Sequence, residues 1–231
     1  MATLTEVMAM LRAQARPGEL EGMARFGMTP DRRLGLSVPT MRQIAKEIGP
    51  DHALALQLWD TGIPDAQMVA AMIDRPSEVT EAQMEAWVAD FNSWDVCDQV
   101  CGNLFEKTPF VWQKVYEWAA RDEEYVRRAA FAMIAGLAWH DKGAPDERFS
   151  ATFPLMKAAA TDERNFVKKA VNWALRNVGK RNVRLNVAAI EAARDIQALD
   201  SRSARWIAAD ALRELQSDAV QQRLHPPGPF A

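Results

Sequence analysis

One stretch of the chain concentrates positive charge around an aromatic ring. Residues 164–184 include seven basic side chains and no acidic one, with Trp173 in the middle, whereas the whole chain of 231 residues has a formal net charge of −3. Such a local positive field attracts a phosphate backbone through counterion release, and the indole offers a face to a sugar or base. The alternative is a solvated helix face. The basic residues are Arg164, Lys168, Lys169, Arg176, Lys180, Arg181 and Arg184.

Trp173 is the residue of this stretch whose direction can be predicted. With about 100° per residue, it lies about 110° from the centre of the apolar stripe of its helix. Its helical neighbours at i−4, i+3 and i+7 are Lys169, Arg176 and Lys180. An indole among cations is a candidate platform for a nucleotide; alternatively it packs on the next helical layer, because large aromatic side chains are usually partly buried. The predicted stripe is Phe166, Val167, Ala170, Val171, Ala174, Leu175 and Val178.

Trp94 and Asp98 form a second constellation. They are four residues apart, so on a helix an indole and a carboxylate project from the same side, beside a stripe that includes Cys97 and Cys101. A carboxylate next to an aromatic ring can stabilise a developing cationic sugar or position an attacking water. The alternative is that Asp95 and Asp98 interact with the macrodipole near a helix start while Trp94 packs.

The remaining reactive side chains complete no familiar catalytic or metal site. Arg128 can fork onto a phosphate, although one of two adjacent arginines is often only solvated. Cys97 and Cys101 share one helix side, but no other Cys or His completes a four-ligand set, so we expect them to be buried as small apolar side chains. No histidine has an obvious Ser or Cys partner, and no Gly-rich phosphate loop is present.

The elements that position these residues are predicted to be helices almost everywhere. Alternating Val, Ile and Thr runs are absent, and Pro and Gly fall between periodic segments. Ser93, Thr108 and Asp162 are predicted helix caps, and Gly179 a residue just after a helix end. The predicted helices are 4–15, 18–26, 39–48, 51–60, 65–74, 80–91, 94–105, 110–120, 123–139, 148–160, 163–178, 184–198 and 203–216.

Internal repetition indicates how the helices stack. The segment 125–129 recurs as 166–170, and 174–176 recurs as 211–213, at offsets of 41 and 37 residues. Periods near 40 with a helix pair in each unit are typical of HEAT and armadillo arrays, which form curved α-solenoids with a concave face. The pattern predicts one domain over residues 1–217 and a short frayed tail over 218–231. Arg128 and Lys169, related by the first offset, are expected on one inner wall.

Composition adds a location and an oligomeric state. The chain shows no signal-like or membrane-spanning apolar run, and two helical cysteines suit a reducing compartment. These features favour a cytoplasmic protein. An open solenoid that grips one duplex needs no second copy, so a monomer is expected.

Several segments together resemble the bacterial DNA alkylation repair proteins of the AlkD type, which are HEAT-like DNA glycosylases. The resemblance covers about residues 23–215. The segments 23–26 and 35–42 are similar to the family's N-terminal helix and its Gly-x-x-x-Pro-x-x-Arg stretch, and 93–98 to its Trp-Asp-x-x-Asp motif. Arg128-Ala-Ala and the segment 166–176 resemble the helices that carry a phosphate-contacting arginine and a second active-site tryptophan.

The resemblance implies hydrolysis of the N-glycosidic bond of cationic alkylated purines, such as 3-methyladenine and 7-methylguanine, in duplex DNA held on a concave face. It implies a catalytic role for Asp98, Trp94 and Trp173, and no metal or organic cofactor. Phe26 stands where relatives can carry tyrosine, which removes a hydroxyl near the DNA. The DNA-binding residues implied by the resemblance and the charge pattern are Arg128, Lys169, Arg176, Lys180, Phe26 and Arg42.

A second hypothesis from another class remains open. The chain could be a non-catalytic HEAT-like solenoid that binds damaged or branched DNA, or a protein partner. Asp98 distinguishes the two, because a carboxylate on a surface meant for phosphate repels that ligand unless it does chemistry.

Overall fold

The structure, a computed structural model, describes residues 2–225, which contain helices, turns and loops and no β-strand. This confirms the all-α prediction. Contacts divide the chain into two compact units, residues 1–111 and 112–231. The single domain expected over 1–217 therefore stays a prediction.

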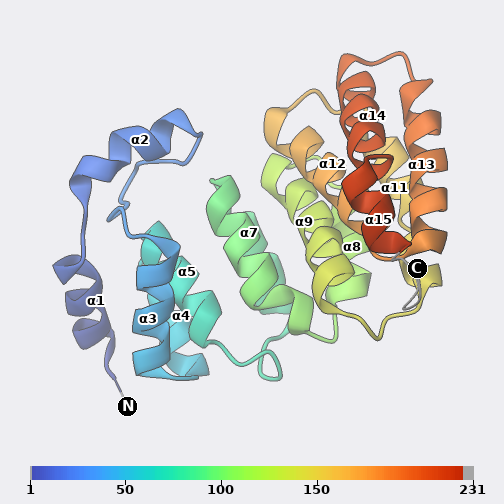
Figure 1. The fold of residues 1–231 in the computed structure, drawn as a ribbon. Helices are drawn as coiled ribbons and strands as arrows, with labels where there is room; N and C mark the ends of the chain where they lie inside the picture. Colours follow the sequence, from blue (N-terminus) through green and yellow to red (C-terminus); the bar gives the residue numbers. More distant parts are fainter. Residues whose placement is uncertain (1, 226–231) are drawn as a thin grey trace. The chain divides into compact units, whose positions relative to one another are not determined.

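The first unit is a series of short helices joined by tight loops (Figure 1). Several begin at predicted kinds of cap: the Thr3, Ser37, Asp51 and Thr80 side chains each accept a hydrogen bond from a backbone N–H of the next turn. The elements are α1 (Leu4–Ala13), η1 (Pro17–Glu19), α2 (Leu20–Arg25), α3 (Val38–Ile48), α4 (His52–Asp60), α5 (Pro64–Ile73), α6 (Glu81–Ala89), α7 (Trp94–Asn103) and η2 (Phe105–Lys107).

Aromatic rings fill the core where α4, α6 and α7 meet. The indoles of Trp59 and Trp87 stack with 4.0 Å between ring centroids and 3° between planes. Phe91 and Phe105 pack around them, and the Trp59 Nε1 donates to Asp90. These ring contacts join α4 and α6 to η2, which follows α7, and to Phe91, three residues before α7 begins.

The second unit is built from longer helices, of which α9, α12 and α14 lie side by side (Figure 1). The Tyr125 and Phe166 rings stack at the starts of α9 and α12, 5.9 Å apart, as the 41-residue repeat predicts for equivalent positions. The elements are α8 (Val111–Ala119), α9 (Glu124–His140), α10 (Asp146–Ser150), α11 (Phe153–Ala159), α12 (Asn165–Gly179), α13 (Val183–Gln197), α14 (Arg202–Leu215) and α15 (Asp218–Leu224).

Three sequence predictions need correction here. The helix expected over 148–160 is two helices, α10 and α11, because Pro154 begins a new first turn. Asp162 does not cap α12, whose N-cap is Arg164 without a side-chain hydrogen bond. The tail is not frayed over 218–224: α15 forms there, and the Gln221 side chain donates to Asn186 at 3.1 Å. The rest of the predicted tail, 226–231, lies outside the described residues.

Gly179 is a glycine for a different reason from the predicted one. It is the last residue of α12 rather than the residue after its end. A Cβ at this position would lie 2.7 Å from the Leu215 Cδ2 and 2.8 Å from the Ala189 Cβ. Because α13 and α14 both approach so closely, only a hydrogen fits where a side chain would begin.

Candidate functional site

The start of α7 holds the first predicted pair. Trp94 and Asp98 are both half-buried, while the stripe beside them is in the core. Cys97 and Cys101 are in that stripe, 0% and 1% exposed, which confirms the prediction that both thiols are buried. The indole and the carboxylate therefore lie at the edge between core and solvent, on one side of the helix.

A buried ion pair holds the beginning of this helix, and the sequence did not reveal it. Arg33, from the loop before α3, binds Asp95 through two bonds, NH1 to Oδ2 at 2.6 Å and NH2 to Oδ1 at 3.1 Å. The Arg33 side chain is 2% exposed. Its Nε donates to the Thr29 carbonyl at 2.9 Å, and Ser93 donates its hydroxyl proton to the Asp95 carboxylate. Asp95 therefore anchors the loop before α3, in addition to any interaction with the helix macrodipole, and we call the Arg33–Asp95 pair the clamp.

The same loop orients Trp94. The Trp94 Nε1 donates to the Phe26 carbonyl at 3.0 Å, and the Thr29 hydroxyl donates to the Asn92 carbonyl at 2.8 Å. The structure therefore brings together Phe26 and Trp94, which are 68 residues apart. The Phe26 ring is 74% exposed. An apolar ring held this far into solvent beside a fixed indole is suited to contact a ligand rather than the core.

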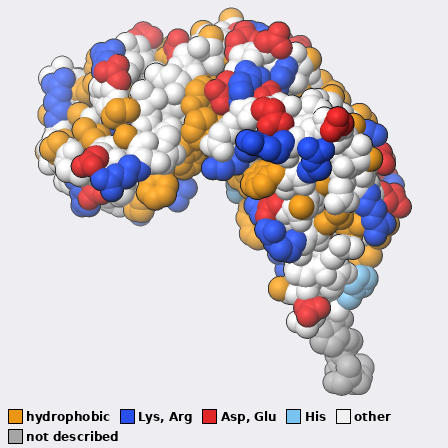
Figure 2. All heavy atoms as spheres, turned by 90° about the horizontal axis from the view of Figure 1, so that it is seen from above, with side chains coloured by type: hydrophobic (Ala, Val, Ile, Leu, Met, Phe, Trp, Pro, Cys, Tyr) orange, Lys and Arg blue, Asp and Glu red, His pale blue; other side chains and the backbone are white. Residues whose placement is uncertain are grey.

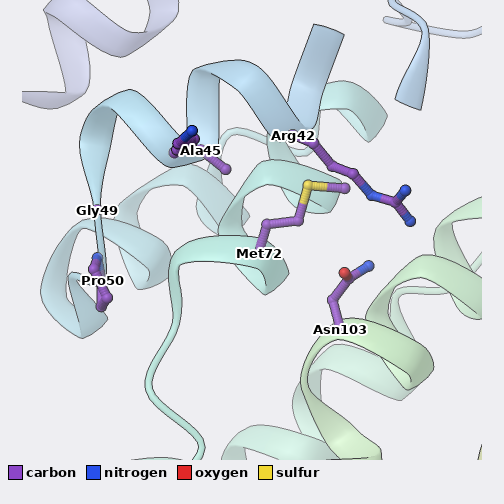
Figure 3. Close-up of a pocket in the computed structure, with 7 residues that line it drawn as sticks. Arg42, Ala45, Gly49, Pro50, Met72 and Asn103 are labelled. Carbon is purple, nitrogen blue, oxygen red and sulfur yellow. The ribbon is translucent and has the colours of Figure 1, made fainter. Parts of the chain in front are cut away.

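Arg42 lines a pocket of about 440 Å³ between α3, the end of α5 and the end of α7 (Figure 3). Lys46 lies one turn further along α3, and both cations are exposed without an ion pair among the described residues. Figure 3 shows the Arg42 and Asn103 side chains directed at the same space beside Met72. No acidic residue lines this pocket, so it suits an anion such as a phosphate. The lining residues are Arg42, Ala45, Lys46, Gly49, Pro50, Met72 and Asn103.

The basic run of α12 is largely neutralised by acids from α14. Arg176 binds Asp210 at 3.3 Å and Glu214 at 2.6 Å, and Lys180 binds Glu214 at 2.6 Å. These acids lie 34 or more residues further along the chain than the cations they bind, outside the basic run. The expected unbalanced positive field is therefore wrong for this part of the helix.

Both ends of the run are compensated as well. Arg164 binds Asp162 at 2.5 Å, and Arg184 binds Glu147 at 2.7 Å. Although burial raises the pKa of Asp162, hydrogen bonds from Arg164 and Arg127 outweigh that effect and lower the pKa to about 2. In Figure 2, Lys and Arg side chains gather on the C-terminal part of the molecule with Asp and Glu side chains between them. The surface is mixed rather than purely basic.

Trp173 lies on the solvent side of α12, between the edges that contact α9 and α14. On one edge the Asn172 amide donates to Asp210, at 2.7 Å, and on the other the Asn177 amide donates to the Ala135 carbonyl, at 3.0 Å. Trp173 is half-buried and Lys169 is exposed, with no ion pair among the described residues. Part of the indole therefore faces solvent beside an uncompensated lysine.

Arg128 is the predicted phosphate-binding residue that the structure buries. It is 6% exposed, and its NH1 donates to the Phe166 carbonyl in the first turn of α12 at 2.7 Å. Its neighbour Arg127 binds Asp162 at 2.9 Å. Arg128 thus contacts the start of the helix that carries Lys169, and of the two only the lysine is exposed; that they line one inner wall stays a prediction.

The predicted site residues divide between the two units. Phe26, Arg42, Trp94 and Asp98 belong to the first unit, and the predicted residues from Arg128 to Lys180 belong to the second. Within the first unit, Phe26 and Trp94 meet. That Asp98 and Trp173 act on one sugar stays a prediction.

The described residues, 2–225, contain neither a candidate metal site nor a candidate membrane span. No group of three or more His, Cys, Asp or Glu side chains there is placed to hold a metal ion. No helix in the same range combines the length and the apolar character needed to cross a membrane.

Comparisons with known proteins identify the family and the fold. The family model described as DNA alkylation repair enzyme matches residues 7–215. A solved structure from a family described as related to the HEAT-like repeat DNA glycosylases, with affinity for branched DNA structures, superposes with a TM-score of 0.76 at 20% identity; 93% of this chain and 96% of that one are covered. This confirms the HEAT-like fold.

More distant comparisons add little. A designed armadillo repeat protein in complex with a (KR)4 peptide superposes with a TM-score of only 0.35 at 15% identity, over 93% of this chain and 88% of that one, and carries no argument. No curated protein matches the chain.

Proposed function

This chain belongs to the DNA alkylation repair enzyme family, and we propose that it hydrolyses the N-glycosidic bond of cationic alkylated purines, of the 3-methyladenine and 7-methylguanine type, in duplex DNA. One observation carries the proposal. Within the part of the chain that matches the family, Asp98 lies one turn from Trp94, half-buried at the start of α7. Trp94 is held there by the Phe26 carbonyl.

Departure of the alkylated purine needs little assistance from the protein. A purine alkylated on a ring nitrogen already carries positive charge, so it can leave without a general acid. The remaining demand is to stabilise an oxocarbenium-like sugar and to place a water, and a carboxylate at the edge of an apolar helix face serves both purposes. We assign these roles to Asp98, and we assign contact with the deoxyribose to the faces of Trp94 and Trp173.

The exposed cations supply the backbone contacts in this proposal. Arg42 and Lys169 are exposed and without ion pairs among the described residues, so they can bind phosphates at once. Arg176 and Lys180 must first exchange Asp210 and Glu214 for phosphate oxygens, which makes their contribution smaller. The buried Arg128 supports the first turn of α12, close to any phosphate that approaches there.

The test is base release from methylated duplex DNA. The purified full chain is incubated with duplex treated with a methylating agent, and freed purines are separated and quantified. We expect release by the natural chain and at least an about 100-fold loss in Asp98→Asn, because the carboxylate acts mainly in the transition state. Asp60→Asn is the matched control, since Asp60 is exposed at the end of α4 in the same unit. Undiminished release by Asp98→Asn overturns the role of Asp98.

A second candidate function is supported by one comparison. The solved structure with a TM-score of 0.76 comes from a family described as having affinity for branched DNA structures. If the natural chain frees no purine yet binds a four-way junction more tightly than linear duplex, the non-catalytic binding function replaces the first proposal.

A further inference from the structure

One face of α14 combines exposed arginines with an exposed indole. The exposed residues recur at i, i+3, i+4, i+7 and i+11 and fall within an arc of about 100° around the helix. The two acids in the second half of the helix, Asp210 and Glu214, both bind Arg176 of α12, and Asp210 also binds Arg213. This leaves a face without acids of its own, made of Arg202, Arg205, Trp206, Ala209 and Arg213, which we name the α14 face.

Trp206 is the centre of the α14 face. Its side chain is 41% exposed, and the Lys168 Nζ of α12 lies 5.4 Å from the ring centroid. Lys169, which follows Lys168 in the chain, is exposed. An indole in the core of a stack would be covered by the next helix, but this ring keeps part of its surface in solvent with cations on either side.

The arginines around Trp206 pair with carboxylates, and the arginine side of each pair stays exposed. Arg205 binds Asp200 at 3.2 Å, with the two side chains 57% and 104% exposed, and Arg202 approaches Glu163 only to 4.0 Å. Arg213 binds the partly buried Asp210, and its own side chain is 75% exposed. The exposed pairs of Arg202 and Arg205 contribute little and are screened by salt, so phosphate oxygens can replace their carboxylates, whereas Arg213 must first exchange Asp210 for a phosphate.

We propose that the α14 face binds single-stranded DNA, with one unpaired base stacked on Trp206 and neighbouring phosphates held by Lys168, Lys169 and the three arginines. A base inside a duplex is already stacked on both sides, so an indole on a helix surface selects for a base that is not. Arg202 and Arg213 are about 16 Å apart along the helix axis, which extends the contact beyond one nucleotide. None of these residues except Lys169 has a role in the proposed base release.

The experiment measures binding of the full chain to fluorescently labelled oligothymidine and to a duplex of equal length by fluorescence anisotropy. We expect Trp206→Ala to weaken oligothymidine binding about 5- to 150-fold, the range for one lost base–aromatic stack, and to leave duplex binding within about twofold. Trp206→Phe should keep most of the affinity, because its ring still stacks.

Trp139 provides a matched control. It is 58% exposed at the end of α9, and the Lys142 Nζ lies 5.0 Å from its ring, while Arg181, which donates to the adjacent Ala138 carbonyl, is only 7% exposed. Trp139→Ala should therefore leave oligothymidine binding unchanged. Replacing Arg202, Arg205 and Arg213 together by Gln should flatten the dependence of log affinity on log salt concentration by about 2.

The outcomes are distinct from those of the proposed function. The proposal is overturned if the natural chain does not bind oligothymidine, if Trp206→Ala weakens duplex and single strand equally, or if Trp139→Ala has the same effect. Base release from methylated duplex, measured on the same variants, should be unchanged by Trp206→Ala. An absence of base release by the natural chain would remove the glycosylase proposal and leave the strand-binding result standing.

Discussion

Two helices, α7 and α12, carry the two tryptophans assigned to the reaction, and they are stabilised in opposite ways. At the start of α7, the first aspartate of the motif pairs with a buried arginine: Asp95, 12% exposed, binds Arg33, whose side chain is 2% exposed. Along α12, the charged residues stay near the surface and are compensated from outside by acids of α14, such as Glu214. The start of one helix is held by an ion pair to a distant loop, and the other helix has its surface charge compensated by its neighbour.

The difference shows what a charged residue in a helical motif can mean. Asp95 is next to Trp94, yet it contributes by anchoring a loop from 62 residues away rather than by facing a ligand. Arg176 is on the same helix as Trp173, yet its guanidinium is paired with two carboxylates of α14. Proximity to an aromatic residue in the sequence therefore does not by itself make a charged side chain part of a binding surface.

The largest expected effect is at the clamp. Arg33→Met should lower the free energy of unfolding by about 3–5 kcal/mol, because it leaves the Asp95 carboxylate buried without its guanidinium. Urea unfolding followed by circular dichroism measures the change. Arg25→Met is the control, since Arg25 pairs with Glu21 on the surface, 74% and 79% exposed, and should change stability little.

A double-mutant cycle decides whether the pair acts as a unit. Arg33→Met combined with Asp95→Ala should cost much less than the sum of the two single changes, because removing both charges removes the unpaired one. Costs that simply add would contradict the clamp and remove the contrast between α7 and α12.

The sequence was sufficient for most of the helices and for the local parts of the site. Periodicity and helix-start residues placed α7 from Trp94, and the i, i+4 spacing put Trp94 and Asp98 on one side of it. The bond from Trp94 to the Phe26 carbonyl, in contrast, depends on a loop conformation that no periodic pattern describes. The Arg33–Asp95 pair was missed for the same reason, since its partners are far apart and neither belongs to a repeat.

The pairing of α12 with α14 can be inferred from the repeat in the sequence. The 37-residue offset that aligned Ala174-Leu-Arg176 with Ala211-Leu-Arg213 already placed the two helices in equivalent positions of neighbouring repeats. Asp210 and Glu214 are on the equivalent turns, so a positive field counted on one helix should have been balanced against them. A charge count within a stack of helices has to include the adjacent layer.

Two helical glycines, one in α12 and one in α7, test how closely each helix is packed against its neighbours. Gly179→Ala, at the end of α12, should lower stability by about 1–3 kcal/mol, because its Cβ would lie 2.8 Å from the Ala189 Cβ. Gly102→Ala in α7 meets nothing within 4 Å, so the gain in helix propensity should raise stability by about 0.5–1 kcal/mol. Thermal unfolding of both variants measures the two effects, and the same sign for both would contradict this account of close packing around α12.

The smallest expected effect tests whether α14 really masks the charges of α12. The double variant Asp210→Asn/Glu214→Gln frees Arg176, Lys180 and Arg213, so duplex DNA affinity should rise about tenfold at low salt. The plot of log affinity against log salt concentration should become steeper by up to about 2.7, since three more phosphates can be neutralised. Fluorescence anisotropy with a labelled duplex across a salt series gives both quantities.

The control for this variant changes the same net charge elsewhere. Glu19→Gln/Glu191→Gln removes two exposed acids that have no ion pair among the described residues, one in each unit. If α14 masks specific cations, this control should leave the salt dependence close to that of the natural chain, because no Lys or Arg is released. An equal gain in both variants would mean that the DNA responds only to the overall charge of −3, and that Arg176 and Lys180 are no nearer to it than any other cation.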